Sequence, residues 1–331
     1  MSKLKSLLIL QTIIIVILAV FLLDVQKSGQ SIAANNTTAS INAVPKDGLL
    51  SPRVYSGLLK PKSYLITNFG QLKNDLLEEP DNRVSVYIEN LRDGANFDIQ
   101  GTKEFPSLSL SKVPLAILVM QKIESGKLSL DTSIQIKDKF RDDSFGDLYK
   151  NSAKELPLSV LMKKMLSESD NTAFHALLDF LDKKDLKLLL DYFPIDFDYY
   201  YKEGNSTQNV YLTVKDYSNV FRSLYLSTLL SAADSEYILN LLTNSTFEIK
   251  KLASLPDEVK VAQKFGLNYV GDNKYLHDCG IMYIGMSKIL YCIMTSGLDA
   301  EMAGQKIGII LKKTYDYIIE SRSELDKYKS G

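Results

Sequence analysis

The fold of this chain is organised around ten residues, Phe105-Pro106-Ser107-Leu108-Ser109-Leu110-Ser111-Lys112-Val113-Pro114. They follow a strand-like segment and lead into the apolar run 115–120, so we predict a buried helix with Ser109 near its first turn. Residues three apart share a face of a helix, which brings the Lys112 ammonium group within hydrogen-bond reach of the Ser109 hydroxyl. The helix N-terminus also offers free backbone N–H groups and a positive dipole end, which suit a developing oxyanion.

A serine hydroxyl becomes a good nucleophile when a neighbour takes its proton, and a desolvated lysine with a lowered pKa can do so. The Ser-x-x-Lys spacing alone is not specific, because Ser2 and Lys5 also show it in the N-terminal tail. Two further motifs follow in order along the chain. Ser169-Asp170-Asn171 lies 60 residues after Ser109, and Lys264-Phe265-Gly266 enters a predicted strand.

Ser-x-x-Lys, Ser-Asp-Asn and Lys-Thr-Gly together are the signature of class A β-lactamases and penicillin-binding proteins. The chain resembles this family from about Val84 to its C-terminal helix, and segment 166–173 is similar to the family's helix around Ser-Asp-Asn. The resemblance implies an active-site-serine hydrolase that forms an acyl-enzyme on β-lactam amides. Two alternatives stay open: a penicillin-binding-type D-Ala-D-Ala peptidase or esterase with slow β-lactam turnover, and a non-catalytic module that binds the cell wall.

The resemblance also implies a role for each motif residue. Ser109 is the nucleophile, and Lys112 is the general base for acylation or part of a proton relay. Ser169 passes a proton to the leaving amine nitrogen, Asn171 donates its amide to the acyl side chain of the substrate, and Lys264 supplies positive charge for a substrate carboxylate. The structural alternatives are a helix N-cap at Ser109, a capping turn at Ser169–Asn171, and solvated lysines at the other two positions.

The neighbours of these residues have supporting roles. Asp170 is expected to hold its loop, and Gly266 lets the substrate backbone approach the strand. The backbone N–H groups of Ser109 and of Leu267, just past the glycine, are expected to form the oxyanion hole.

Two positions of the predicted substrate site depart from the family pattern. Phe265 stands where the family usually has Thr or Ser, whose hydroxyl binds a substrate carboxylate; losing such a bond costs roughly 1.5–3 kcal/mol. Alternatively, the Phe265 ring points into the core, since it alternates with Lys264 along the strand. Cys279 occupies a position where β-lactamases often have a cation, and the nearby His277 either reaches the site or packs at the strand start.

A third departure lies in the loop 192–205. Class A β-lactamases carry there a Glu, with an Asn four residues later, that positions the water for deacylation. No Glu of this loop has that partner, and Glu203, Asp198 and Asp196 are the candidate replacements. Without a positioned base, acylation proceeds and hydrolysis is slow, which is typical of penicillin-binding proteins.

Periodicity and turn residues alone predict only a mixed class of helices and strands. Together with the resemblance they imply an α+β fold, an antiparallel sheet flanked by helices plus an all-helical subdomain. The predicted helices are 64–79, a helix beginning near Ser109, 157–166, 173–181, 213–230, 232–244 and 300–322, and the predicted strands are 83–88, 95–100, 258–265, 276–284 and 287–295.

The chain contains two cysteines, Cys279 and Cys292, which face each other if Gly285-Met286 forms a two-residue hairpin turn. A disulfide is compatible with an extracytoplasmic domain. Directly opposed cysteines pair with strain, however, so we expect two buried free thiols rather than a bridge.

The N-terminus predicts a membrane anchor or signal segment over 1–24, a flexible linker over 25–56 and a catalytic domain over 57–331. Residues 7–23 are apolar apart from Gln11 and Thr12, and Lys3 and Lys5 precede them. A run of this length is at the short end for a membrane span, and the basic flank keeps that end in the cytoplasm. We expect a bacterial single-pass membrane protein with its catalytic domain outside, or a secreted one if the segment is cleaved near residues 31–33.

Composition excludes several classes of function. The net charge of −1 over 331 residues gives no electrostatic basis for binding nucleic acid. His175 and His277 are the only histidines and no zinc-type spacing occurs, so we expect neither a metal site nor a cofactor. The expected partner is a small β-lactam or a peptidoglycan peptide, bound by a monomer.

Overall fold

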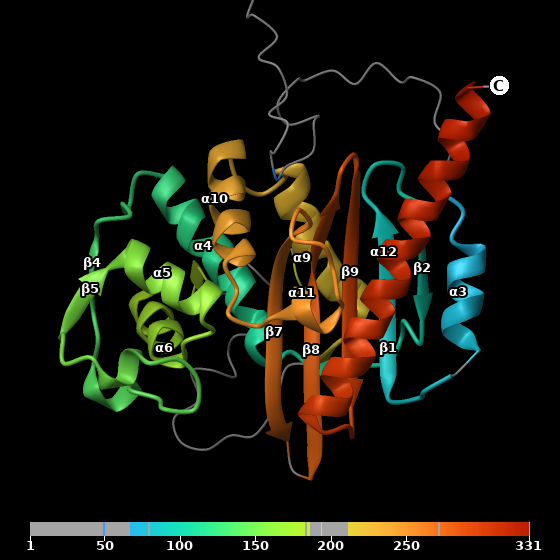
Figure 1. The fold of residues 1–331 in the computed structure, drawn as a ribbon. Helices are drawn as coiled ribbons and strands as arrows, with labels where there is room; N and C mark the ends of the chain where they lie inside the picture. Colours follow the sequence, from blue (N-terminus) through green and yellow to red (C-terminus); the bar gives the residue numbers. More distant parts are fainter. Residues whose placement is uncertain are drawn as a thin grey trace, which may run out of the picture. The chain divides into compact units, whose positions relative to one another are not determined.

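A five-stranded antiparallel sheet lies at the centre of the fold (Figure 1). The computed structural model describes residues 49, 67–78, 80–182, 184–185, 193, 211–270 and 272–330, with side chains up to residue 321. The strand order is β2-β1-β9-β8-β7. These strands are β1 (Val84–Asn90), β2 (Asn96–Ile99), β7 (Lys260–Val270), β8 (Asn273–Ile284) and β9 (Ser287–Ser296). The N-terminal hairpin therefore pairs with a three-stranded meander from the C-terminal part of the chain.

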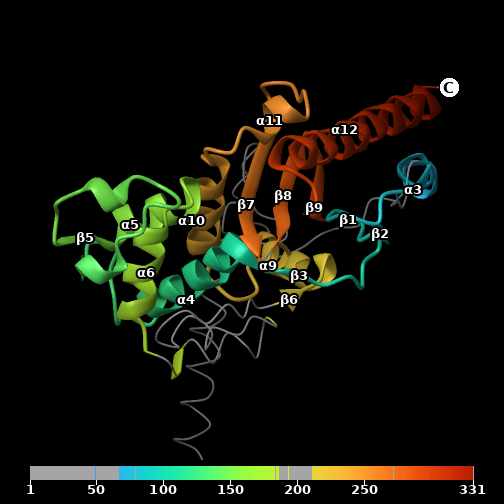
Figure 2. The ribbon, with the colours of Figure 1, turned by 90° about the horizontal axis from the view of Figure 1, so that it is seen from below.

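Alternation along the strands sends side chains into two separate cores. In β9, Cys292 and Met294 enter one core and Ile293 enters the other. All seven residues of β1 are buried, because both faces of the sheet are covered by helices. Figure 2 shows α11 (Ile249–Leu252) and α12 (Ala300–Ser330) on one side of the sheet, with α4 and α9 on the other.

The core that contains Cys292 and Met294 continues from the sheet into the all-helical part of the fold. This part contains α4 (Lys112–Glu124), α5 (Leu158–Ser167), α6 (Asn171–Phe180) and α10 (Ala232–Thr243), and α9 (Val214–Leu226) joins it to the sheet. Residues 112–120 of α4 are all buried, which fits a helix without a polar face. The predicted α+β class with its helical subdomain is confirmed.

Short elements complete the fold. They are α3 (Gly70–Leu77), the two-stranded pairs β3 (Phe105–Pro106) with β6 (Tyr211–Leu212) and β4 (Ser133–Gln135) with β5 (Glu155–Pro157), and the 3-10 helices η1 (Leu108–Ser111), η2 (Asp138–Phe140) and η3 (Leu148–Lys150). A capping box between Thr213 and Asp216 begins α9, whereas Ser227, with φ 53°, ends it earlier than predicted.

The disulfide expectation is corrected by the structure. Cys279 and Cys292 are opposed across β8 and β9, as the predicted hairpin turn requires, and they form a disulfide rather than two free thiols. Their Cα atoms lie 4.0 Å apart.

The N-terminal predictions fall outside this description. The anchor or signal segment 1–24 lies outside the described residues, and so does the linker 25–56 apart from Leu49. Within the part of the chain that the structure describes, no helix has both the length and the apolar character needed to cross a membrane.

Candidate active site

A cavity of about 570 Å³ lies where the helical part meets the end of β7. It contains three of the predicted site residues, Ser109, Lys112 and Asn171, together with Leu267 of the predicted oxyanion hole. The remaining lining residues come from η1, the loop before η3, α6 and β7, and are Leu108, Ser111, Asp142, Ser144, Phe145, Phe174, His175, Asn268 and Tyr269.

Ser109 lies in η1, and the α-helix begins only at Lys112. Leu108, just before it, has φ 48°, a left-handed conformation that costs a non-glycine residue energy and is typical of constrained sites. Gly266 of β7 packs against this turn: a Cβ at Gly266 would lie 3.0 Å from Leu108 Cβ and 3.3 Å from the Ser109 backbone nitrogen. The missing side chain therefore lets β7 approach the Ser109 N–H, the predicted oxyanion donor.

Lys112 is fully buried and its amine faces the Ser-Asp-Asn motif. Nζ donates hydrogen bonds to Ser169 O at 2.5 Å, Ser169 Oγ at 3.1 Å and Asn171 Oδ1 at 2.7 Å. Among the described hydrogen bonds, none joins Lys112 to Ser109. Burial lowers the pKa of Lys112 to about 7, and the carboxylates of Asp170 and Asp142 limit the fall. The alternative of a solvated lysine is wrong, because the side chain is buried. An amine with a pKa of about 7 can accept a proton at neutral pH.

The Ser-Asp-Asn turn is held rigidly. Ser169 is buried with φ 56°, and Asp170 caps α6 by accepting from the backbone of Ala173 at 2.8 Å. Asp170 also accepts from the Leu148 N–H at 2.8 Å, so it joins the loop before η3 to α6. That loop approaches at Gly146, where a Cβ would lie 2.0 Å from Asp170 Oδ2. The expectation that Asp170 holds its loop is confirmed.

Lys264 is also fully buried and does not line the cavity. Its Nζ donates to the Phe265 carbonyl at 2.9 Å. Burial holds the pKa of Lys264 well below its ordinary value; the charge of Lys112 lowers it further and Asp278 opposes this. The two buried amines are therefore electrostatically coupled, and the surface-lysine alternative at Lys264 is wrong.

The Phe265 side chain is buried, so the predicted alternative in which its ring points into the core is correct. Its ring stacks on Phe247 at 5.0 Å between centroids and meets Phe145, a cavity residue, at 5.9 Å. The aromatic ring thus fills space behind the cavity wall, and this position offers no hydroxyl.

Sequence comparison places this architecture in a known family. Residues 70–318 match the β-lactamase enzyme family. The chain belongs to that family. Among curated proteins, none matches the sequence.

Solved structures of β-lactamases share the fold of this β-lactamase family member. The extended-spectrum β-lactamase TLA-1 has a TM-score of 0.66 and 20% identity, over 75% of this chain and 98% of its own. A β-lactamase from Chitinophaga pinensis has a TM-score of 0.65 and 21% identity, over 76% and 99%. The protein PBP-A has a TM-score of 0.63 and 15% identity, over 76% and 95%. These similarities show a common fold.

In this family member, His277 lies in the core and not on the cavity wall. The predicted contact of His277 with substrate is therefore wrong, and the alternative, packing at the strand, is correct. The Thr295 N–H donates to Nδ1 at 3.3 Å, so Nε2 carries the proton and donates to Pro106 O at 3.0 Å. Burial lowers the pKa of His277 to about 4. A neutral histidine thus links β8 to β3, directly before η1.

Several lining residues were missed by sequence reasoning. Asp142 and His175 lie 3.5 Å apart on the cavity wall, and Ser144 accepts a 2.8 Å hydrogen bond from Asn171 Nδ2. His175 follows Asn171 by four residues, so helical spacing places both on one face of α6, and this signal was available. Asp142 and Ser144 lie in a loop without periodicity and had no such signal. The candidate deacylation bases Glu203, Asp198 and Asp196 lie outside the described residues.

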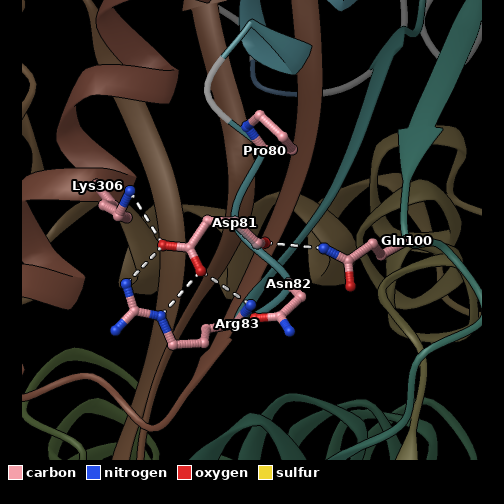
Figure 3. A pocket seen from close by; sticks show the side chains of 6 residues that line it. All are labelled: Pro80, Asp81, Asn82, Arg83, Gln100 and Lys306. Atoms are coloured by element: carbon pink, nitrogen blue, oxygen red, sulfur yellow. Dashed lines mark hydrogen bonds and ion pairs between the residues drawn. The ribbon is translucent and has the colours of Figure 1, made fainter.

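Another cavity, of about 590 Å³, lies between α12 and the start of β1 (Figure 3). Its polar groups bind one another. The Asp81 carboxylate pairs with Arg83 at 2.9 Å and Lys306 at 3.0 Å, and Gln100 donates to the Asp81 carbonyl at 2.8 Å. These contacts connect α12 to the segment just before β1. The residues that line this cavity include neither a serine nor a buried amine.

Proposed function

We propose that this protein is a serine hydrolase that opens β-lactam amides through an acyl-enzyme on Ser109. The observation that carries the proposal is the buried amine of Lys112, hydrogen-bonded to Ser169 and placed in one cavity with Ser109. An amine with a pKa of about 7 is suited to take a proton from a hydroxyl and to return it within one turnover.

The acylation step follows from this geometry. Lys112 in its neutral form takes the proton of Ser109 as Oγ attacks the carbonyl carbon. The N–H groups of Ser109 and Leu267 stabilise the oxyanion. The proton then passes from Lys112 through Ser169 Oγ, 3.1 Å away, to the ring nitrogen as the amide C–N bond breaks.

A second candidate is a D-Ala-D-Ala-type peptidase or esterase with slow β-lactam turnover. The sequence of loop 192–205 favours it, because no Glu there has the Asn partner that positions a deacylating water in class A β-lactamases. The packed ring of Phe265 supplies no hydroxyl for the carboxylate of either kind of substrate. A point mutant of the similar protein PBP-A has been solved as an acyl-enzyme complex with penicillin G, so this fold accommodates such an adduct. A purely binding module has no need of two desolvated amines, whose burial costs free energy.

Intact mass spectrometry with benzylpenicillin over time separates these candidates. We expect a mass increase equal to one whole penicillin. Clearance within seconds, with ring-opened product, indicates a β-lactamase, and persistence for hours indicates a penicillin-binding-type enzyme. No adduct contradicts the β-lactam proposal and directs the search to peptides and esters.

For cellular location, we propose that residues 1–24 anchor the protein in the bacterial cell membrane with the hydrolase domain outside, as a monomer. The apolar run after Lys3 and Lys5 supports this orientation. Fractionation of cells that express the full chain, with and without residues 1–24, tests it: only the full chain should sediment with membranes.

A further inference from the structure

His175 is a titratable side chain on the cavity wall that the acylation step does not use. It lies on α6 one helical turn after Asn171, which accepts a hydrogen bond from the Lys112 amine. Its side chain is 33% exposed. Phe174 at 5.4 Å and Phe140, stacked at 6.3 Å between centroids, fix the plane of the imidazole.

Asp142 orients the imidazole ring. Its Oδ2 lies 3.5 Å from His175 Nε2, and its own backbone N–H donates to Thr172 Oγ1 on α6 at 3.0 Å. Ser144 donates its backbone N–H to Asp142 Oδ1 at 2.8 Å. The backbone of Asp142 is thus held by α6 and its carboxylate is held at Oδ1, so Oδ2 faces Nε2 and favours the tautomer with the proton on Nε2. Nδ1 then carries the lone pair of a base.

Burial keeps the His175 side chain neutral at physiological pH. Burial is the largest cause and lowers its pKa below the ordinary value; Asp142 raises it and Lys112 lowers it. Lys137 and Lys139 lie over the ring of Phe140, the stacking partner, and Lys137 is paired with the Asp179 carboxylate of α6 at 2.5 Å. A neutral imidazole next to a fixed carboxylate is the usual arrangement of a general base.

We propose that His175, positioned by Asp142, is the general base that activates water for hydrolysis of the acyl-enzyme. This inference rests on the acyl-enzyme at Ser109 proposed above. It assigns the second half of the reaction to a residue of α6 rather than to a carboxylate of loop 192–205, where the family places its base.

Hydrolysis of the acyl-enzyme needs one water molecule and a proton for Ser109. His175 removes one proton from water, directly or through a second water, and the hydroxide oxygen bonds to the acyl carbon. The bond from that carbon to Ser109 Oγ breaks, and Oγ takes a proton from Lys112. The Lys112 amine is neutral after acylation and has regained this proton from solvent before the bond breaks. The product is the free acid, which ionises, and the imidazolium formed at His175 loses its proton to solvent in the open cavity.

The test compares His175→Gln with the unchanged protein by intact mass, using benzylpenicillin and separate measurements of adduct formation and clearance. Glutamine is uncharged and of similar length, and the site is partly exposed, so the fold should tolerate it. We expect formation within twofold of the unchanged protein and clearance slower by about 10²–10⁴-fold, the usual contribution of a general base. Asp142→Asn should slow clearance by a smaller factor.

Chemical rescue separates catalysis from a structural role. In His175→Ala, added imidazole should restore clearance in proportion to its neutral form, which a packing defect does not predict. Equal clearance by His175→Gln and the unchanged protein overturns this inference alone, as does an adduct that never clears from the unchanged protein. No adduct on Ser109 in any variant overturns the proposed function and this inference with it.

Discussion

At the scale of single residues, the chemistry depends on two amines removed from water. Lys112 and Lys264 are both fully buried; burial lowers the pKa of each amine, and the charge of Lys112 lowers the pKa of Lys264 further. Desolvation is costly for stability, and here it lowers the pKa of both amines below the ordinary value of lysine. In the proposed mechanism this lets Lys112 act as the base. The carboxylates of Asp142 and Asp170 keep the pKa of Lys112 near 7 instead of lower.

Acylation should therefore depend on pH through Lys112. The step needs the neutral amine, and the pKa of about 7 means that this form is lost as pH falls below 7. We expect the rate of adduct formation to fall about tenfold per pH unit below 6.5 and to level off above 8. Intact mass at short times between pH 5 and 9 measures it, with circular dichroism at each pH as the folding control. A rate independent of pH from 5.5 to 8 contradicts this role.

Phe265→Thr should affect stability and substrate binding in opposite directions. Removing a packed ring costs about 3 kcal/mol in the free energy of unfolding, whereas the introduced hydroxyl can bind a carboxylate and lower the half-saturating concentration of benzylpenicillin about tenfold. Urea unfolding and adduct titration measure the two effects. Phe265→Leu is the matched control and should lose about 1 kcal/mol without any gain in binding.

At the scale of elements, close backbone contacts bring the three motifs together. β7 reaches η1 at Gly266, the loop before η3 reaches Asp170 at Gly146, and His277 links β8 to β3. Sequence reasoning predicted the helices and strands that carry the motifs. The 3-10 turn at Ser109 and the early end of α9 at Ser227 were missed, because both depend on left-handed backbone conformations that non-glycine residues adopt only in a specific tertiary context.

Gly146→Ala should disrupt the Ser-Asp-Asn turn. A Cβ there would lie 2.0 Å from the Asp170 carboxylate, and φ is +85°. Gly126→Ala is a matched control, with φ +71° and no atom within 4 Å of its Cβ. We expect the control to lose about 1 kcal/mol from backbone strain alone, and Gly146→Ala to lose clearly more and to acylate more slowly. Equal losses with unchanged acylation contradict the proposed role of this contact.

At the scale of the whole molecule, the order of the motifs along the chain was enough to predict an α+β fold and the residues that the cavity brings together. Ser109, Lys112 and Asn171 share the cavity as predicted. Asp142 was not predicted, because loop residues reach a site through the path of the backbone rather than through periodicity. The register that opposes Cys279 and Cys292 was predicted correctly, but free thiols were favoured over the bridge because opposed cysteines pair with strain, and the structure contains the bridge.

The central claim is that Ser109 becomes acylated, and the neighbouring Ser111 offers a control. Both serines lie in η1 and line the cavity, and the Ser111 hydroxyl donates to Leu108 O at 2.9 Å. The decisive measurement is intact mass after exposure to benzylpenicillin for Ser109→Ala beside Ser111→Ala. The account predicts no adduct on Ser109→Ala and one adduct on Ser111→Ala. An adduct that remains on a folded Ser109→Ala contradicts it.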